Sequence, residues 1–489
     1  MTELAVFGGK QLVVLALIMP LLGALLAFTI GGRTARWIAL LTALVELVVV
    51  VSLAWIVVDQ QIVVEYQLGG WEPPLGVRLR ADGATVLVLL TATVVMTATM
   101  ISAHADWQPL PDQHETRAGL VFWTLLPALW AAFNTVLLSQ DLFNLFVALE
   151  ILTFCAVPLV CLNGKAETFA AALRYLLFAL LGSVLYLLGA GLIYGLWGTL
   201  DIGLLALEIS KLNRYPPALS LALGLMTAGL MAKTAIVPLH LWLPPAHAGA
   251  PAPVSAILSA VVVKAAFVVL LRLWFELMPG SADTMVAQTQ GVLGGLAIVL
   301  GGVLALRQSR LKPMIAYSTI AQMGYLFLVF PLAGAASAWG AGLLHLCSHA
   351  LAKAALFLAA GQIITHFGDD RIDHLAGLGH VMPLTLLAFG VAGFSLMGLP
   401  PTGGFVAKWW LLQAAIETGH WGWAVPILFG GLLTAGYVFR VLAVALRPAA
   451  TPALAASAVP HTANAMILLL ALSSLLLGLA ALGTGLPPQ

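Results

Sequence analysis

Long apolar runs dominate this chain, and each has about the length that a lipid bilayer requires. A transmembrane helix needs ~20 mainly apolar residues, and about fourteen such runs can be marked along the chain. The runs are continuously apolar instead of alternating with period two, which argues against barrel strands. The predicted spans are 11–30, 36–58, 82–104, 119–138, 141–162, 168–196, 216–249, 252–277, 287–306, 312–332, 338–364, 381–415, 422–446 and 462–484.

Two of these spans are too long and too interrupted for plain helices. The first contains Pro238, Pro244 and Pro245, and the second contains Gly398 with Pro400–Pro401. Proline removes a backbone donor, and a membrane tolerates the break only where protein or water satisfies the freed groups. Two broken helices five spans apart predict two inverted five-helix repeats with a transport route at the breaks. Ordinary proline kinks are the alternative.

Composition supports a polytopic all-α membrane protein. Of the 489 residues, 61% are hydrophobic and 8% charged, and the formal net charge is +1. The mean hydropathy is +1.03. A charge this close to zero excludes an electrostatic nucleic-acid binder. The three cysteines fall inside predicted spans, and their pattern suggests no disulfide framework, iron–sulfur ligation or zinc site. We therefore expect no cofactor and no metal, and we interpret 11–30 as the first helix instead of a cleaved signal peptide.

The chain divides into an N-terminal three-helix segment (1–110), a first five-helix repeat (119–277), a second repeat (287–446) and a C-terminal helix (447–489). Basic residues collect on one side of the membrane, which predicts both termini outside a bacterial-type inner membrane. The inside loops carry Arg33, Arg36, Arg117, Lys165, Arg307, Arg310, Lys312, Arg371, Arg440 and Arg447, and the outside loops carry Lys10, Arg78, Arg80, Lys211 and Arg214. One outside loop, 59–79, alternates like a strand around Ile62–Tyr66, which predicts a hairpin at the membrane surface.

Lone charges inside the apolar spans are the strongest functional signal. A charge near the bilayer centre costs at least ~2.5–3.5 kcal/mol on insertion scales. Carrying one acid and four lysines there makes little sense for a passive anchor and indicates a pathway that moves charge. The candidate pathway residues are Glu150, Lys233, His240, Lys264, His345, His349, Lys353 and Lys408.

Three of these residues lie near mid-depth when the helical rise is counted. Glu150 is ~13–14 Å from the outer end of its span, and Lys264 is ~18 Å from the inner end of its own. Lys408 lies about as far from the outer loop at Gly419–His420. The hydrocarbon core is ~30 Å thick, so its middle is at ~15 Å. A row of titratable groups at this depth can form a lateral wire.

Glu150 needs a cation to stay ionised, and Lys233, just before the break at Pro238, is the expected partner. Separating the two would make the lysine release its proton, because desolvation disfavours the charged form. Lysine suits this role better than arginine, which stays protonated. A static ion pair that locks two helices is the alternative.

His345, His349 and Lys353 step by four along one helix and therefore share one face. Histidine titrates near neutrality, so this face is a candidate proton relay. The His345–His349 spacing also fits zinc, but no third ligand is near in sequence. Helix packing is a further alternative. Outside this set, Glu46 has no evident partner, and we interpret it as a protonated packing residue, with a position facing a neighbouring subunit as the alternative. Arg272 and Glu276, four residues apart, are expected to pair.

Four stretches together resemble the antiporter-like proton-translocating subunits shared by respiratory complex I, membrane-bound hydrogenases and Mrp-type Na⁺/H⁺ antiporters. They are the run ending at Glu150 (DLFNLFVALE), the run Ala232–His247 with 250–255 and Lys264, the run LKPMIAYS at 311–318, and His345–Phe357 with Pro400–Trp409. In length the chain is closest to the medium complex I subunits and the Mrp D subunit.

The resemblance implies a fourteen-helix subunit with two inverted five-helix repeats and broken seventh and twelfth helices. It also implies a buried Glu150–Lys233 pair, a central Lys264, a polar eleventh helix with His345, His349 and Lys353, and a far-side Lys408. Three positions depart from the family pattern. Arg310 stands where an acid is frequent, Gln322 where many members have a titrating histidine, and Pro245 where an aspartate is frequent.

The sequence therefore predicts a proton-translocating subunit of a multi-subunit membrane complex, with other membrane subunits, the lipid bilayer, protons and possible Na⁺ as partners. One rival is Na⁺/H⁺ exchange, for which Thr234, Ser255 and Ser259 could supply oxygens. Another keeps the fold but energises a soluble partner such as an inorganic-carbon uptake enzyme. A membrane enzyme using His240 and His247, and a purely structural subunit, complete the alternatives.

Overall fold

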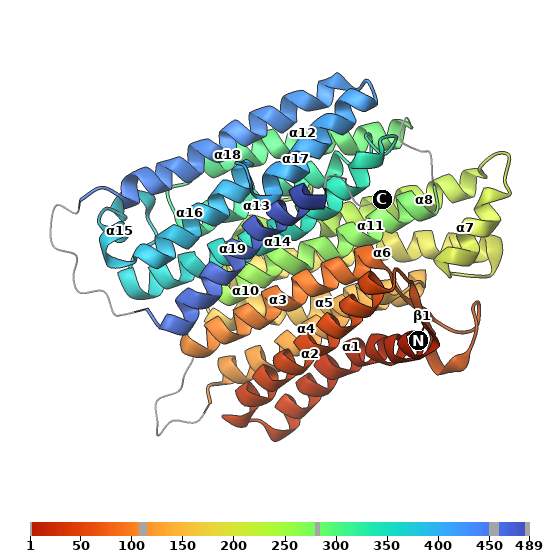
Figure 1. Ribbon diagram of the computed structural model, residues 1–489, viewed down its shortest axis with the longest axis horizontal. Coiled ribbons are helices and arrows are strands. Elements are labelled where there is room, and N and C mark those ends of the chain that lie inside the picture. The colour runs from red at the N-terminus through yellow and green to blue at the C-terminus, as the bar shows by residue number, and fades with distance from the viewer. Residues whose placement is uncertain (1, 107–114, 279–283, 449–458, 485–489) are drawn as a thin grey trace. The chain divides into compact units, whose positions relative to one another are not determined.

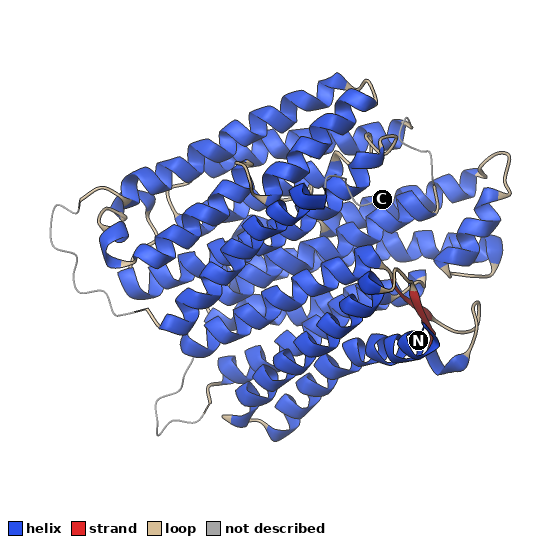
Figure 2. Ribbon diagram, viewed as in Figure 1, coloured by secondary structure: helices blue, strands red, loops and turns tan. Residues whose placement is uncertain are grey.

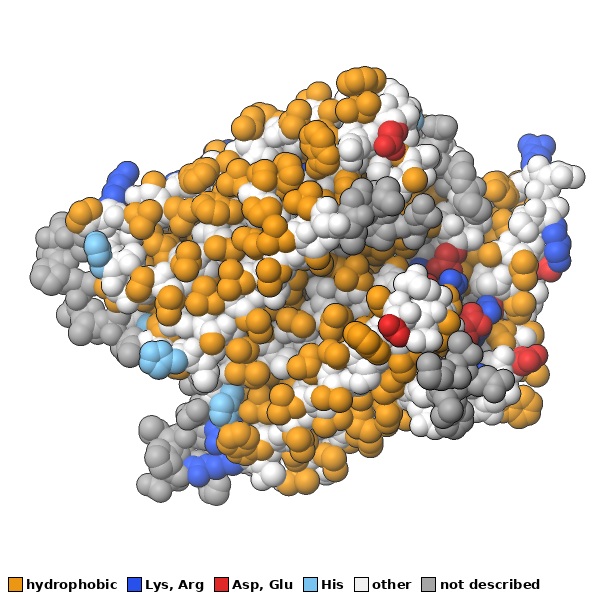
Figure 3. All heavy atoms as spheres, in the orientation of Figure 1, with side chains coloured by type: hydrophobic (Ala, Val, Ile, Leu, Met, Phe, Trp, Pro, Cys, Tyr) orange, Lys and Arg blue, Asp and Glu red, His pale blue; other side chains and the backbone are white. Residues whose placement is uncertain are grey.

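The computed structural model describes residues 2–106, 115–278, 284–448 and 459–484, and they are mostly helical (Figures 1 and 2). Within this described part, 11 helices are long and apolar enough to cross a membrane. The surface over the helices in view is largely hydrophobic, as a lipid-facing surface must be (Figure 3). The chain is a multi-pass helical membrane protein, as the apolar runs predict.

Two compact units divide the chain. The first comprises the described residues up to Thr97 and within 115–234 and 261–278. Its helices and strands are α1 (Thr2–Ile30), α2 (Thr34–Asp59), β1 (Val64–Gln67), β2 (Arg78–Ala81), α3 (Gly83–Asp106), α4 (Arg117–Leu138), α5 (Leu142–Val160), α6 (Ala166–Trp197), α7 (Ile202–Ser210), α8 (Pro217–Lys233) and α11 (Val263–Glu276). Most of α3 belongs to this unit, while the last residues of that helix cluster with the second unit.

The second unit holds residues 98–106 and 235–260 and the described residues from Thr284 onward. Its helices are α9 (Leu243–Gly249), α10 (Ala252–Ile257), α12 (Met285–Leu306), α13 (Leu311–Phe327), α14 (Ala336–Gln362), α15 (Leu378–Val381), α16 (Pro383–Met397), α17 (Gly403–Glu417), α18 (Ala424–Ala445) and α19 (His461–Thr484).

The loop after α2 forms the expected hairpin: β1 and β2 pair antiparallel, with Val64 opposite Ala81. The short helix α7 was not predicted from the sequence. Asp201 begins it, because its carboxylate accepts the backbone N–H of Leu204 at 2.9 Å and so satisfies an orphan donor of the first turn. The same carboxylate pairs with Arg78 of β2 at 2.6 Å, which ties the hairpin to α7.

The first long span, 216–249, is interrupted where its prolines stand. Helix α8 ends at Lys233, residues 234–242 form turns, and α9 begins at Leu243. Ala235 adopts a positive φ of 54°, a conformation that ends a helix. Thr234 closes α8, since its N–H donates to the Leu230 carbonyl at 2.9 Å.

The second long span, 381–415, is interrupted at Gly398–Thr402 between α16 and α17. In an unbroken helix the carbonyl of Leu396 would accept the N–H four residues on, but that residue is Pro400, which has none. Gly398 turns the chain with a φ of 87°. The break therefore leaves the Leu396 carbonyl open to side chains from elsewhere in this unit.

Glycines allow the helices of each unit to approach closely. A Cβ on Gly182 of α6 would lie 2.5 Å from the Gly229 carbonyl of α8, and one on Gly229 would lie 2.2 Å from the Gly182 carbonyl. In the second unit, a Cβ on Gly294 of α12 would lie 2.7 Å from the Gly324 carbonyl of α13. Small residues at such contacts are the usual packing device of membrane helices, where backbone proximity replaces a hydrophobic driving force.

Two helical spans are enclosed by protein, because the most apolar stretches of Ala252–Glu276 and Ala336–Phe367 are completely buried. Each span contains a π-helical segment, at Leu258–Val262 and at Ile363–Phe367. Such segments interrupt the regular ladder of hydrogen bonds and occur frequently at functional sites. Lys264 and Lys353 lie on these two spans.

Candidate functional site

The first unit contains a buried ion pair between α5 and α8. The Lys233 ammonium lies 3.0 Å from Oε1 of Glu150, and the two side chains are 7% and 15% exposed. Lys233 is the last residue of α8, so its charge also interacts favourably with the negative end of that helix. The pair expected from the sequence is therefore formed in the structure.

Two hydroxyl groups complete the surroundings of this pair. Lys233 also donates to Oγ1 of Thr153 at 3.3 Å, one turn beyond Glu150 on α5. The Ser183 hydroxyl of α6 donates to Oε1 of Glu150. The close approach of α6 and α8 at Gly182 and Gly229 brings the three helices together here, with the Lys233 stem beside Gly182.

Lys264 is fully buried and is the second residue of α11, directly after the π-helical segment Leu258–Val262. The extra residue per turn in such a segment rotates the side chains that follow it relative to a regular helix. The segment therefore changes the helical register of Lys264 relative to α10, which the spacing of residues in the sequence alone does not show.

Lys353 of α14 donates to α13 of the same unit. Its ammonium lies 2.5 Å from the Ile315 carbonyl and 2.5 Å from the Ser318 hydroxyl. The aromatic ring of Phe357, one turn on, lies 5.8 Å from the same ammonium. Lys353 is thus surrounded by oxygen dipoles and an aromatic face on α13 and α14.

Lys408 of α17 reaches the helix break. Its ammonium donates to the Leu396 carbonyl at 2.5 Å and lies 4.2 Å from the centre of the Tyr325 ring. Gln322 of α13 donates to the same carbonyl at 3.2 Å. The carbonyl that Pro400 leaves unpaired in its own helix is therefore shared by a lysine and a glutamine.

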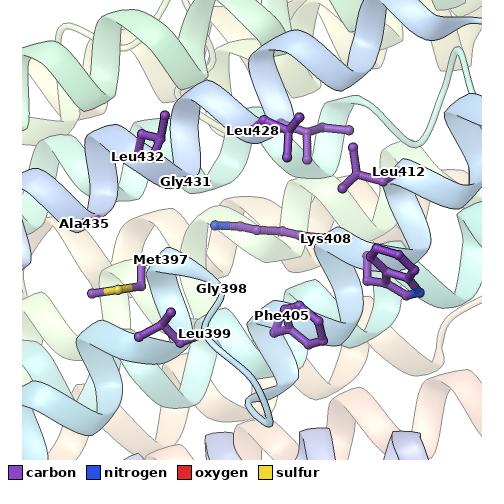
Figure 4. Close-up of a pocket in the computed structure, with 12 residues that line it drawn as sticks. Met397, Gly398, Leu399, Phe405, Lys408, Leu412, Leu428, Gly431, Leu432 and Ala435 are labelled. Carbon is purple, nitrogen blue, oxygen red and sulfur yellow. The ribbon is translucent and has the colours of Figure 1, made fainter.

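A pocket of about 280 Å³ lies beside Lys408. Figure 4 shows the lysine extending across it, between Met397 and Gly398 on one side and Gly431 and Leu432 on the other. Apart from Lys408, the lining is nearly all apolar, and Leu432 of α18 is 70% exposed. The pocket therefore joins a buried charge to an apolar surface of the second unit.

The histidines of α14 share one face, as the four-residue spacing predicts. The His345 and His349 rings stack with centres 5.9 Å apart, and Tyr325 lies 5.4 Å from His345. Nε2 of His345 lies 3.2 Å from the Gln322 carbonyl. The backbone carbonyl of Gln322 therefore contacts His345. Its side-chain amide contacts the Leu396 carbonyl, which also accepts a hydrogen bond from Lys408.

His240 lies apart from these contacts, in the turn segment between α8 and α9, and is partly exposed. His247 stacks on Phe357 at 5.0 Å. Among the described residues, no group of three or more histidine, cysteine, aspartate or glutamate side chains could hold a metal ion. The local pair Arg272–Glu276 is formed, at 4.0 Å.

The structure thus brings Glu150 to Lys233 and His345 to His349, while Lys353 and Lys408 bind hydroxyl and carbonyl oxygens. The partners Ser183, Thr153 and Ser318 were not predicted from the sequence. Helical spacing could have suggested Thr153, three residues after Glu150 on α5. Ser183 and Ser318 lie on helices other than those of the groups they contact and had no local signal.

Comparison with known proteins identifies the family of this chain. A family model described as NADH:quinone oxidoreductase/Mrp antiporter, TM, matches residues 139–434. The chain is 36% identical over 381 residues to NADH-quinone oxidoreductase subunit N of Desulforudis audaxviator, covering 77% of this chain and 74% of that protein. It is 27% identical over 429 residues to the D subunit of the Na⁺/H⁺ antiporter of Alkalihalophilus pseudofirmus, covering 87% and 85%.

Among solved structures, a chain of the membrane-bound sulfane sulfur reductase, an archaeal respiratory membrane complex, superposes with a TM-score of 0.86. Its sequence identity is 27%, and the match covers 97% of this chain and 95% of that one. The resemblance found in the sequence motifs is confirmed. This chain belongs to the NADH:quinone oxidoreductase/Mrp antiporter transmembrane family.

Proposed function

We propose that this chain translocates protons across the membrane as an antiporter-like subunit of a multi-subunit complex. The observation that carries the proposal is the buried Glu150–Lys233 pair at the end of α8, directly before a helix break. A carboxylate and an ammonium held at a discontinuity can separate when the break moves. A passive structural subunit has no need for such an arrangement.

The proposed pathway comprises Glu150, Lys233, His240, Lys264, His345, His349, Lys353 and Lys408. While Glu150 is close, its charge keeps the Lys233 ammonium protonated. When the pair opens, desolvation disfavours the ammonium, and the proton leaves for the next group. The oxygens of Thr153, Ser318 and the Leu396 carbonyl accept hydrogen bonds from the lysines and orient them between steps.

Hydration at the two breaks supplies the entrances and exits in this proposal. The interruptions at 234–242 and 398–402 support fourteen transmembrane helices with two inverted five-helix repeats, the first at 119–277 and the second at 287–446. The remaining segments, 1–110 and 447–489, flank the repeats, and both termini lie outside the inner membrane. Energy comes from partner subunits or an ion gradient.

Similar proteins come from multi-subunit membrane complexes, which supports other membrane subunits as partners of this chain. The relatives are named as subunits of an NADH-quinone oxidoreductase and of a Na⁺/H⁺ antiporter, and the solved neighbour is part of a respiratory membrane complex. We infer that other membrane subunits pack against the exposed apolar faces of this one. Mass spectrometry of the complex purified in mild detergent identifies them.

Na⁺/H⁺ exchange is the second candidate, favoured by the similarity to one of the subunits of a Na⁺/H⁺ antiporter. Oxygen ligands for a hard cation are present in the second unit. The Ser259 and Thr319 hydroxyls lie 2.9 Å apart, and the Ser255 hydroxyl donates to the His247 carbonyl at 2.8 Å. Thr234, in contrast, donates to the carbonyl of Met231 within its own helix.

The experiment reconstitutes the purified complex in liposomes with an internal pH indicator and compares sodium with potassium buffers. Proton translocation on addition of the energy source, equal in both buffers, supports proton pumping. Translocation that requires sodium supports exchange. Absence of proton movement by an intact, energised complex contradicts both.

A further inference from the structure

Another buried acid of the first unit lies on helices that the proposed pathway does not use. Glu46 of α2 is 0% exposed and accepts a hydrogen bond from Nδ2 of Asn134 on α4, 2.8 Å from its Oε1. Nδ2 of Asn134 also donates to the Ala16 carbonyl of α1, at 2.7 Å. Asn134, likewise 0% exposed, therefore connects three helices at one point.

The oxygens of Glu46 and Asn134 outnumber the hydrogen-bond donors available to them. An asparagine amide has two N–H donors, and both are used, by the Ala16 carbonyl and by Oε1 of Glu46. Two buried oxygens remain without a hydrogen-bond partner among the described residues, Oε2 of Glu46 and Oδ1 of Asn134. Leaving both unsatisfied costs about 1–3 kcal/mol for each group.

A single proton on Glu46 satisfies both oxygens. A carboxylic acid and a primary amide are complementary, because the amide N–H donates to the acid C=O while the acid O–H donates to the amide C=O. The first of these two bonds is present, and the second would join the two oxygens that have no hydrogen-bond partner among the described residues. We propose that Glu46 and Asn134 form a proton-binding site, separate from the Glu150–Lys233 pair, in which Glu46 is a neutral carboxylic acid.

The packing around Glu46 supports a neutral acid over a carboxylate. Helices α1 and α4 contact α2, and α1 approaches it closely at Gly23, where a Cβ would lie 2.2 Å from the Thr42 hydroxyl. The charged side chains described on these three helices lie toward helix ends. Arg36 and Asp59 of α2 are ten and thirteen residues from Glu46, roughly 15 and 20 Å along the axis.

The other two charged side chains described on these helices are equally unsuitable partners. Lys10 of α1 is exposed and lies six residues from Ala16, about 9 Å along the axis. Arg117 of α4 lies seventeen residues from Asn134, about 26 Å. A carboxylate at position 46 would therefore have one amide hydrogen bond and no close countercharge, which a membrane interior tolerates poorly.

Infrared difference spectroscopy tests the protonation state directly. The purified complex carrying the wild-type chain is compared at neutral pH with Glu46→Gln, using ¹³C-labelled glutamate to assign the band. The expected result is loss of one neutral carboxylic C=O stretching band in Glu46→Gln. Loss of a carboxylate band instead, with no change among the carboxylic bands, overturns the proposal and indicates an ionised Glu46 hydrated by a buried water.

Thermal stability as a function of pH gives an independent readout. Glutamine at position 46 can form both hydrogen bonds with Asn134, so Glu46→Gln should match the wild-type Tm near pH ~4, where Glu46 is protonated in the folded and in the unfolded chain. As the pH rises above about 4.3 towards neutral, wild type should lose stability relative to the variant, because the unfolded chain releases the Glu46 proton while the folded chain retains it. A Tm difference that stays constant between pH ~4 and neutral pH, or a wild type that gains stability over the variant in this range, contradicts a proton bound there.

Asn134→Leu is the matched control, since leucine has a similar volume and no amide. It should lower the Tm and shift the Glu46 carboxylic band to the position of a weakly bonded acid. An unshifted band in Asn134→Leu contradicts the paired geometry, even if Glu46 is protonated.

Discussion

Lys233 and Lys408 are both buried lysines at helix breaks, but their charges are stabilised differently. Lys233 stands in the last turn of its own helix and pairs with a carboxylate 3.0 Å away. Lys408 belongs to the helix after its break and reaches back to the Leu396 carbonyl, in the last turn of α16, with Tyr325 beside it. One site has a countercharge, and the other has a carbonyl dipole and a ring.

The free energies of these contacts show how strongly each lysine depends on a countercharge. A hydrogen bond to a charged group contributes ~1.5–3 kcal/mol, and a desolvated cation–π contact contributes ~2 kcal/mol. Together these are comparable with the ~2.5–3.5 kcal/mol cost of a lysine at the membrane centre. The Lys408 charge is therefore close to balance without any acid. The Lys233 charge depends on Glu150, and a movement of Glu150 changes its balance at once.

The largest effect on stability is expected at the acid-paired site. Lys233→Met leaves the buried Glu150 carboxylate without its cation, which should destabilise the chain by about 3–5 kcal/mol. Thermal unfolding of the purified complex measures this loss. The control is the double variant Lys233→Met with Glu150→Gln, which has no unpaired charge and should recover most of the Tm. A double variant as unstable as the single one contradicts a role for the charge pair.

At the second site the expected change in stability is smaller. Lys408→Met keeps an unbranched side chain of similar length and removes the charge without stranding an acid. The Leu396 carbonyl keeps its hydrogen bond from Gln322. The free energy of unfolding should therefore change by less than about 1.5 kcal/mol. If Lys408→Met destabilises the complex as much as Lys233→Met, the two sites do not differ in the way described.

Gln322 links the second break to the histidine face, and removing its side-chain amide tests that link. Gln322→Leu leaves the Leu396 carbonyl to Lys408 alone and removes the contact with Thr434, at a cost of about 1 kcal/mol. Gln322→Glu offers a comparison of similar shape, because its carboxylate cannot donate to the Leu396 carbonyl but adds an acid near Lys408. A higher Tm for Gln322→Glu than for Gln322→Leu measures the attraction to Lys408, and a Tm of Gln322→Leu equal to that of wild type contradicts the amide contact.

The smallest effect is expected at an exposed pair outside the spans. The hydrogen bond from the backbone N–H of Arg371 is the largest cause that lowers the pKa of Asp369 below its ordinary value. The contact with the His374 ring, at 2.5 Å, is the second cause. A carboxyl group whose pKa is lower in the folded chain than in the unfolded chain stabilises the fold at a pH above its unfolded pKa of about 3.9. This stabilisation is lost as the pH falls through the folded pKa. Asp369→Asn should therefore lower the Tm slightly at neutral pH and leave it unchanged at a pH below the folded-state pKa of Asp369. A difference that persists in acid rules out this origin.

The sequence predicted the part of the site that depends on charge. A lone acid and a lone lysine in apolar spans must compensate each other, and Glu150 and Lys233 do pair. The shared face of His345 and His349 followed from a spacing of four residues on one helix. The breaks near Pro238 and Pro400 followed from the absence of a proline N–H.

What the sequence did not predict depends on backbone atoms and on helix rotation. Nothing in the residue pattern marks the Leu396 carbonyl as an acceptor until the position of Pro400 after α16 is known. Gln322 was interpreted as the loss of a titrating group, whereas its amide shares that carbonyl with Lys408. Asn134, the partner of Glu46, was visible only as one amide in an apolar span, and its direction depends on the packing of α1, α2 and α4.

The most direct test of the central claim measures proton translocation by the reconstituted complex with Lys233→Met and Glu150→Gln combined. This double variant keeps the fold by the argument above, so lost transport cannot be attributed to unfolding. We predict that proton movement per turnover falls to the background of liposomes without the complex. Translocation at the wild-type level by the folded double variant would contradict a proton pathway through Glu150 and Lys233.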